Sequence, residues 1–587
     1  MYGLNKLYLL MEKQHNRGQD GAGIAAVKLN TEPGYPFMHR IRSNANQPIA
    51  QLFEEIGQEF KEAELHQPEL RNHPGLMKGH LRFLGEVLLG HLRYGTQGKN
   101  DVQFCHPFIK LDIIPARNLA LAGNFNLVNT EDMFRHLNMN PGPFQMQSDL
   151  AAMMEVLHHY LVKADEEAPG EPDLAAVLRK AIPQFDGGYH FSGIIGNGDA
   201  FVMRDPHGIR PSYYYINDDV IVAASERPAI RTAFNLEENE VQELMPGQAM
   251  IVKAAGSIHF EQITPALERK ACSFERIYFS RGSDESIYRE RIALGHKLSS
   301  TVLKAIDYDL KNSIFSFIPN TAETAFYGLI KGAEDYLNQI KIERILSWGN
   351  DVDPEKLTEM VNRRVRIEKI AIKDVKLRTF ITEDSSRNEM VQHVYDITYG
   401  TVRAGQDTLV VIDDSIVRGT TLKESIIRML SRLKPKHIII VSSAPQIRYP
   451  DCYGIDMSKL GDFVAFRAAI ALIRERKMDS LLTDLLAKCH ELDKKGELHT
   501  ENLVRQVYKP FSLDEISDKI AQLITPQDIE IPVSVIYQTI ETLHEACPEN
   551  TGDWYFTGNY PTPGGNKVCN KAFMNFMEGR NVRGYGS

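Results

Sequence analysis

The stretch Thr408–Thr421, TLVVIDDSIVRGTT, decides how the second half of this 587-residue chain folds. Its apolar run Leu409–Ile412 is typical of a buried strand, and the strand ends at two adjacent acids, Asp413 and Asp414. The residues that follow, Leu422–Leu430, have apolar positions at helical spacing. The sequence therefore predicts a strand, a tight loop and a helix in succession.

The loop of this unit has the features of an anion-binding site. Backbone N–H groups at a helix N-terminus attract phosphate. The side chains expected to line the loop are Ser415, Arg418, Thr420 and Thr421. Two carboxylates beside a phosphate would repel it, so the site requires Mg²⁺ or ribose hydroxyls as partners. These residues alone also allow another interpretation, a strand-to-helix turn in which the acids only cap the helix. A G-x-G-x-x-G motif and a Walker A lysine are both missing here, which disfavours dinucleotide binding and nucleotide hydrolysis.

The same alternation of strand and helix extends on both sides of the loop. Strands SIFSFIP, DTLVVIDD and HIIIVSS alternate with helical stretches, which predicts a parallel α/β sheet over residues 266–460. A charged helical insertion is expected at about 331–373, and a helical extension with a flexible tail at 461–587. Residues 1–265 show short apolar runs split by Gly, Pro and Asn, which favours an α+β sandwich of mainly antiparallel strands.

Composition excludes several classes of protein. The net charge is 67 − 77 = −10, which argues against a general nucleic-acid binder. Six cysteines without a C-x-x-C pair exclude a disulfide scaffold and give no support to a zinc ribbon. No signal peptide and no run of about 18 apolar residues is visible. We therefore expect a cytoplasmic protein that does not bind membranes or nucleic acid.

The strand–loop–helix unit resembles the phosphoribosyl-pyrophosphate (PRPP) loop of class I phosphoribosyltransferases. The resemblance implies that Asp413 and Asp414 face the ribose and Mg²⁺, and that the loop, with Gly419, holds the 5-phosphate. Ile318–Glu323 resembles the family's pyrophosphate loop and offers Thr321 as a contact, with alanine following it where relatives carry a hydroxyl. Arg378 begins a stretch that resembles the family's mobile loop over PRPP.

The N-terminal third resembles the class II glutamine amidotransferase domain, an N-terminal-nucleophile fold. The matching stretches are QHNRGQDGAG (14–23), GHLRYGTQG (90–98), LAGNFNLVN (121–129) and QSDL (147–150). The resemblance implies that Arg93 holds the glutamine α-carboxylate and Asp149 its α-amino group. It also implies an oxyanion hole made by Asn124 and the backbone N–H of Phe125. Without the resemblance, Arg93 could equally be a residue that forms an ordinary ion pair, and Asp149 could be an ordinary helix cap.

The two halves together resemble the amidophosphoribosyltransferase family. Two further stretches support this, Arg204–Pro211 and Ser442–Met457, and a weaker one at Asp553–Pro561. The resemblance implies conversion of PRPP, glutamine or ammonia, and water into 5-phosphoribosylamine, glutamate and pyrophosphate, the first step of purine synthesis. It also implies a homo-oligomer with purine nucleotides as feedback inhibitors. A non-catalytic PRPP-sensing regulator and another PRPP-dependent transferase remain as alternatives.

The glutaminase nucleophile is the main departure from the family. Relatives attack glutamine with a cysteine at the first position of the mature chain, whereas the first cysteine here is Cys105, expected to be a small buried residue. No nucleophile is found, and the sandwich is expected to lack its first strand. Either translation begins at an internal Met or glutaminase activity is lost; in both cases we expect residues 1–587 to use only ammonia. The family's iron–sulfur subtype has a cysteine pair near its counterpart of Asp553–Pro561, but this stretch contains no such pair. Cys272 lies where one ligand could be, and because one matching position is not a site, we expect no iron–sulfur cluster.

Overall fold

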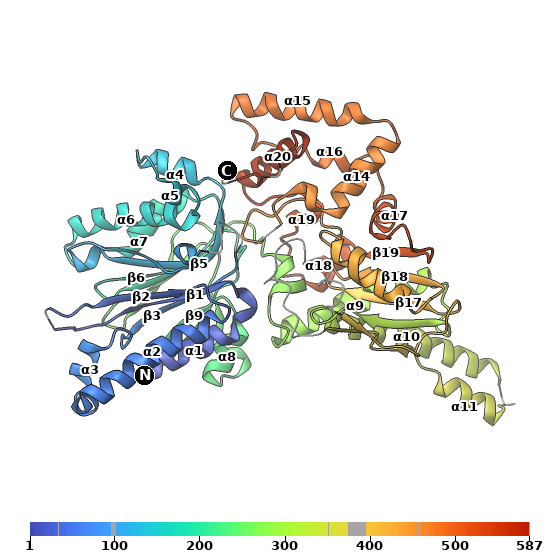
Figure 1. Ribbon diagram of the computed structural model, residues 1–587, viewed down its shortest axis with the longest axis horizontal. Helices are drawn as coiled ribbons and strands as arrows, with labels where there is room; N and C mark the ends of the chain where they lie inside the picture. The colour runs from blue at the N-terminus through green and yellow to red at the C-terminus, as the bar shows by residue number, and fades with distance from the viewer. Residues whose placement is uncertain are drawn as a thin grey trace.

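The computed structural model describes residues 1–32, 34–95, 101–349, 352–373, 395–455, 457–580 and 582–585. Within these ranges the chain forms two lobes, one built from the N-terminal part and one built around a parallel sheet (Figure 1). Among the described residues, no helix combines the length and the apolar character that crossing a membrane requires.

The first lobe is a sandwich of two β layers with helices on both outer faces (Figure 1). One layer is a six-stranded antiparallel sheet in the order β12-β11-β7-β6-β5-β4. Its strands are β4 (Phe108–Lys110), β5 (Leu119–Leu127), β6 (Gly187–Ile195), β7 (Ala200–Arg204), β11 (Gln248–Val252) and β12 (Ile258–Gln262). Helices α6 (Asp149–Glu167) and α7 (Leu174–Ala181) pack on its outer face and bury a large apolar cluster there. Ser148 caps α6 by accepting a hydrogen bond from the Ala151 amide.

The second layer of this lobe consists of two separate three-stranded sheets, β2-β1-β3 and β10-β8-β9. The strands are β1 (Gly21–Val27), β2 (Met38–Ser43), β3 (Val87–Arg93), β8 (Tyr213–Ile216), β9 (Ile221–Ala224) and β10 (Gln242–Glu243). Helices α1 (Tyr2–Lys13), α2 (Pro48–His66) and α8 (Arg227–Phe234) cover the outer side of this layer. The two antiparallel layers confirm the predicted α+β sandwich.

The second lobe is built on a five-stranded parallel sheet in the order β14-β13-β17-β18-β19. The strands are β13 (Ser313–Phe317), β14 (Arg366–Ile367), β17 (Thr408–Asp413), β18 (His437–Ser442) and β19 (Val533–Tyr537). Val410 and Ile412 pack toward helices α9 (Glu285–Ala305) and α10 (Glu323–Ser347). Leu409 and Val411 face the opposite side, where η8 (Leu422–Ile426) and α13 (Ile427–Ser431) lie. A strand covered on both faces is apolar at every position, which explains the run that the sequence shows.

The segment expected as a charged helical insertion projects from this lobe (Figure 1). It contains the second half of α10 and the helix α11 (Pro354–Asn362), and it returns through β14. The next strand, β15 (Ala371–Lys373), pairs with β16 (Tyr395–Ile397) in a separate two-stranded sheet.

Residues beyond 460 form seven helices within the described ranges and one strand of the main sheet. The helices are α14 (Val464–Glu475), α15 (Asp479–Lys495), α16 (Arg505–Tyr508), α17 (Leu513–Ile524), α18 (Ile540–Ala546), α19 (Trp554–Thr557) and α20 (Pro563–Met577). The strand β19 pairs with β18, so part of this segment completes the parallel sheet. Trp554 donates a hydrogen bond from Nε1 to Asp451 Oδ1 at 2.8 Å. The expectation of a flexible end is wrong at Tyr585, which is buried in the apolar cluster of this lobe.

Candidate active site

The four residues assigned to glutamine by resemblance line one cavity of about 710 Å³ in the first lobe. Arg93 is the last residue of β3, Asn124 and Phe125 lie on β5, and Asp149 is the first residue of α6. These elements come from both layers of the sandwich and from its outer helix. The fold therefore brings together residues that the sequence spreads over 57 positions, from 93 to 149.

Arg93 is held in place by the turn that follows α1. The Asp20 amide donates to the Arg93 carbonyl oxygen at 3.0 Å, and Asp20 Oδ2 accepts from the Gly95 amide at 2.7 Å. A Cβ atom at Gly18 would lie 2.5 Å from the Arg93 carbonyl carbon, so the close approach of the two segments requires glycine. The Arg93 side chain is buried, with its guanidinium 5.9 Å from the centre of the Phe104 ring. Gly18 and Asp20 of the QHNRGQDGAG motif thus fix the backbone at Arg93.

Asn124, one of the two oxyanion-hole candidates, is oriented so that it can donate a hydrogen bond, as this role requires. Asn124 Oδ1 accepts a hydrogen bond from Arg210 Nη2 at 2.5 Å, which orients the amide nitrogen as the group left to donate. The bulky Phe125 side chain stacks on the His106 ring, with centroids 5.8 Å apart and planes 18° apart. Arg210 lies within the Arg204–Pro211 motif, which the sequence analysis noted without giving this residue a role.

Asp149 is a buried carboxylate at the start of a helix. Burial raises its pKa to about 6, while hydrogen bonds from the Leu127 and Leu150 amides, at 3.2 and 2.9 Å, favour the charged form. Above that pH the group is a buried anion in the wall of the cavity. It can therefore bind an ammonium group strongly.

Cysteine is missing from the described residues that line this cavity. Cys105 lies behind the lining, fully buried, with its Sγ 3.6 Å from the carbonyl oxygen of Ser43. Burial raises the pKa of its thiol, so it is not an activated nucleophile.

The described residues among those assigned to PRPP lie at one edge of the parallel sheet in the second lobe. Asp413 ends β17, and Asp414 follows it directly. Phe317 of the neighbouring strand β13 pairs with Ile412, so both strands end at the same level. The Thr321 loop therefore leaves the sheet beside the two acids, and its Pro319–Asn320 peptide bond is cis.

Both acids have raised pKa values. Burial is the main cause for both groups, and the charge of Asp414 adds to it for Asp413. The pKa of Asp413 lies well above its usual range, and that of Asp414 is raised to about 6. The hydroxyl of Ser415, which donates to Asp414 Oδ1 at 2.8 Å, and the charges of Arg291 and Lys373 oppose this shift. The pair is therefore poised to accept a cation.

The loop after the acids turns at Gly419, whose φ of +72° places it in the left-handed region. A Cβ atom there would lie 2.8 Å from Ile524 Cγ2 of α17. The exposed side chains of Thr420 and Thr421 stand at the start of the helix that follows. Arg418 is also exposed, with Nη2 3.4 Å from Asp462 Oδ2. Hydroxyls, a guanidinium and a helix start thus surround an open loop, as an anion site requires.

Comparisons with known proteins find relatives that match most of the chain. A glutamine amidotransferase domain family matches residues 107–232. The amidophosphoribosyltransferase of Pseudomonas aeruginosa is 28% identical over 407 residues, covering 65% of this chain and 71% of the relative. That of Escherichia coli is 26% identical over 488 residues, covering 80% of this chain and 82% of the relative. This chain is a relative of the amidophosphoribosyltransferases.

Solved structures show that the fold is shared as well. The glutamine PRPP amidotransferase from B. subtilis, solved with ADP and GMP, superposes with a TM-score of 0.63 at 21% identity, covering 95% of each chain. A structure described as the allosteric regulatory enzyme of purine biosynthesis gives the same TM-score at 22% identity, covering 95% of this chain and 93% of its own. The likeness of the fold therefore spans both lobes of this chain.

Arg378 and Cys272 are the two remaining residues for which the family resemblance gave an expectation. Arg378, expected to begin the mobile loop, lies outside the described residues. Cys272 is buried with its Sγ 2.5 Å from Tyr555 Oη, and burial raises the pKa of its thiol to about 12. In the described ranges, no group of three or more His, Cys, Asp or Glu side chains could hold a metal ion.

A short helical segment, Glu275–Phe279, contacts residues of both candidate sites, and sequence reasoning did not single it out. Glu275 pairs with Arg17 at 2.7 Å and lies 3.5 Å from the Arg210 that orients Asn124. Tyr278 lies near enough to Asp414 for that carboxylate, after burial, to help raise the tyrosine pKa to about 12. The sequence around Glu275–Phe279 has no regular spacing of apolar residues, so it gave no indication of a role for this segment.

Proposed function

We propose that this chain is an amidophosphoribosyltransferase that forms 5-phosphoribosylamine and pyrophosphate from PRPP and ammonia, the first step of purine nucleotide synthesis. One observation carries the proposal: the half-buried pair Asp413 and Asp414 ends a parallel strand beside an open phosphate loop, in a chain whose other lobe holds a glutamine-type cavity. A salvage phosphoribosyltransferase would not need the first lobe, and an unrelated amidotransferase would not need the second.

The residues of the second lobe bind and orient PRPP. The loop Ser415–Thr421 holds the 5-phosphate through backbone N–H groups and hydroxyls. The neighbouring Thr321 loop faces the pyrophosphate, and Arg378 belongs to a loop that closes over the substrate. Transfer at the anomeric carbon passes through an oxocarbenium-like state, which the carboxylates of Asp413 and Asp414 stabilise electrostatically.

Mg²⁺ fits the acid pair. Two adjacent carboxylates with raised pKa values carry charge that a hard divalent cation would compensate, and oxygen ligands are what Mg²⁺ prefers. We propose that Asp413 and Asp414 hold the ion together with PRPP oxygens. When bound, the ion neutralises charge on the pyrophosphate leaving group.

In the first lobe we propose a glutamine-binding pocket. Arg93 pairs with the α-carboxylate, Asp149 with the α-amino group, and Asn124 with the backbone N–H of Phe125 forms the oxyanion hole. Because no thiol is found among the described lining residues, we assign ammonia as the nitrogen donor that residues 1–587 use.

The proposals for regulation, oligomeric state and cell compartment follow from the same family resemblance. The B. subtilis neighbour was solved with ADP and GMP, which supports purine nucleotides as feedback inhibitors. We propose a cytoplasmic homo-oligomer that does not bind nucleic acid. The excess of acidic residues fits this last point.

Pyrophosphate release tests the proposal. The purified chain is given PRPP and Mg²⁺ with either ammonium chloride or ammonia-free glutamine. We expect release with ammonium chloride alone. Release with glutamine would show that another residue acts as nucleophile, and no release with either donor would refute the assignment as a transferase.

A further inference from the structure

A pair of helices projects from the second lobe and has apolar side chains exposed to solvent. We define the projecting hairpin as the end of α10, residues 338–349, together with α11 and its flanks, residues 352–364 (Figure 1). The first part of α10 is anchored in the core, where Phe326 and Leu337 pack beside the parallel sheet. Beyond Leu337, Lys341 is the one buried residue in the described helix α10. The hairpin therefore extends past the packing that supports the lobe.

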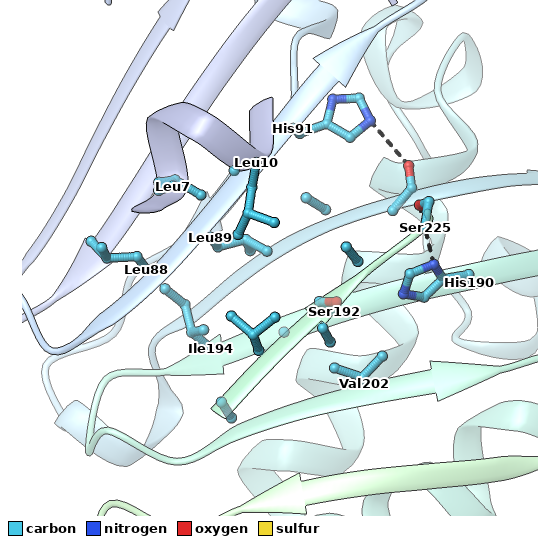
Figure 2. A pocket seen from close by; sticks show the side chains of 18 of the residues that line it. Leu7, Leu10, Leu88, Leu89, His91, His190, Ser192, Ile194, Val202 and Ser225 are labelled. Carbon is cyan, nitrogen blue, oxygen red and sulfur yellow. Dashed lines mark hydrogen bonds between the residues drawn. The ribbon is translucent and has the colours of Figure 1, made fainter. Parts of the chain in front are cut away.

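Two large apolar side chains form a stripe on the exposed side of α10. Ile342 and Leu346 are 59% and 75% exposed, and their spacing of four residues places them on one face of the helix. Val361 of α11 is 48% exposed. In the first lobe, side chains of this kind, such as Leu10 and Ile194, line a cavity instead (Figure 2). An apolar stripe on an exposed helix is a surface on which another helix can pack.

The net charge of the hairpin favours a second copy of this chain as the occupant of this surface. Residues 338–364 contain five basic and five acidic residues, a net charge of 5 − 5 = 0, whereas the whole chain carries −10. Two acidic surfaces repel each other, but two neutral hairpins do not. The hairpin is thus a part of the chain where self-association meets no net electrostatic repulsion.

The charges are also separated along α11. Asp353 and Glu355 lie at its outer end, and Arg363 and Arg364 lie at its inner end, before β14. All four side chains are exposed, and the ion pairs that Asp353 and Arg363 form within the hairpin are long, at 3.7 and 3.8 Å. Two hairpins that run in the same direction would place like charges together. Two that run in opposite directions place the acids of each copy against the arginines of the other, as a twofold dimer requires.

We propose that the projecting hairpin is a dimerisation surface that binds the same hairpin of a second copy of this chain. The two hairpins run in opposite directions, so that Ile342 of each copy packs on Leu346 of the other and four helices form a small bundle. The nine residues of α11 span about 14 Å at ~1.5 Å per residue, so the contact is small and its Kd lies in the micromolar range. This surface is one that the proposed homo-oligomer would use, and it does not depend on transferase activity.

Sedimentation velocity of the full chain over a concentration series tests the apolar stripe. Leu346→Glu places a charge in the contact, so at high concentration the wild type should have at least twice the mass of this variant. Leu65→Glu is the matched control, because Leu65 is 76% exposed on α2 of the other lobe, and it should sediment as the wild type does. Equal masses for the wild type and Leu346→Glu throughout the series would overturn the second copy as the occupant.

A mixing experiment tests the direction of pairing. Asp353→Asn with Glu355→Lys makes both ends of α11 basic and keeps a helix cap, because asparagine also caps helices. Arg363→Glu with Arg364→Glu makes both ends acidic. We expect each double variant alone to associate at least tenfold more weakly than the wild type, and an equimolar mixture to recover the wild-type association. A mixture that stays as weak as its components would overturn the antiparallel pairing.

Ammonia-dependent pyrophosphate release keeps this proposal apart from the proposed function. None of these substitutions lies in either candidate site, so every variant should keep the wild-type rate, and an unchanged Tm reports folding independently of activity. Expected masses without pyrophosphate release by any chain, the wild type included, would refute the proposed function and support the hairpin contact. Normal release with masses that no substitution changes would refute the hairpin contact alone.

Discussion

Replacing Asp414 with asparagine should stabilise the protein while abolishing transfer. The pKa of Asp414 rises from 3.8 to about 6, mainly through burial. A shift of that size corresponds to about 3 kcal/mol of unfavourable free energy for the charged form. The side chain is only half-buried, so solvent screening reduces the gain to roughly 1–2 kcal/mol. In a domain of this size we expect Tm to rise by about 3–6 °C.

The sign of the effect follows from proton linkage. A carboxyl whose pKa is raised on folding binds protons more tightly in the folded state, so wild-type stability falls as pH rises from about 4 through about 6. The asparagine carries no such cost. The advantage of Asp414→Asn is therefore full above about pH 7 and vanishes toward pH 4. The variant also relieves repulsion on Asp413, whose pKa should fall.

The assay is urea unfolding without Mg²⁺ at pH 4.5, 6 and 8, paired with pyrophosphate release from PRPP and ammonia. Asp484→Asn on the exposed face of α15 is the matched control and should change neither quantity. A variant equally or less stable than wild type at pH 8 would refute the claim that the acid pair is held under electrostatic stress. Retained transfer would refute its role in the site.

Four further predictions concern the remaining contacts. Glutamine binding, measured by calorimetry, should weaken below about pH 6 because Asp149 loses its charge there; Asp149→Asn should bind weakly at every pH. Arg93→Lys should lower glutamine affinity about 10–100-fold through loss of a bidentate pair, with ammonia-dependent turnover unchanged. Gly419→Ala should cost about 1–2 kcal/mol in urea unfolding and raise the KM for PRPP, because φ is +72° there; a normal KM would contradict the loop assignment. Glu275→Gln should raise the KM for PRPP, whereas Glu243→Gln, which also removes an arginine partner, should not.

Local signals in the sequence were enough to place most elements. The run Leu409–Ile412 is apolar at every position because both faces of β17 are covered, and this alone indicates a parallel sheet. Ser148 was recognisable as a helix cap because its side chain acts within four residues of the chain. Asp413 and Asp414 were placed at a strand end by the same local reasoning.

Features that depend on distant partners could not be read in this way. β19 is a short strand far along the chain, and only its pairing with β18 makes it part of the sheet. Arg210 donates a hydrogen bond to Asn124, 86 residues away, in the cavity of the first lobe, and nothing in its own sequence neighbourhood indicates that partner. Tyr585 is buried by packing that a glycine-rich terminal sequence does not suggest.

The segment Glu275–Phe279 contacts residues of both candidate sites. Glu275 is buried between Arg17 and Arg210, so its position fixes the arginine that orients Asn124 in the glutamine cavity. Three residues later, the Tyr278 carbonyl accepts a hydrogen bond from Arg291, at 3.2 Å, and that arginine's charge favours ionised Asp414. We therefore expect a displacement at one site to move a charge at the other through this five-residue segment.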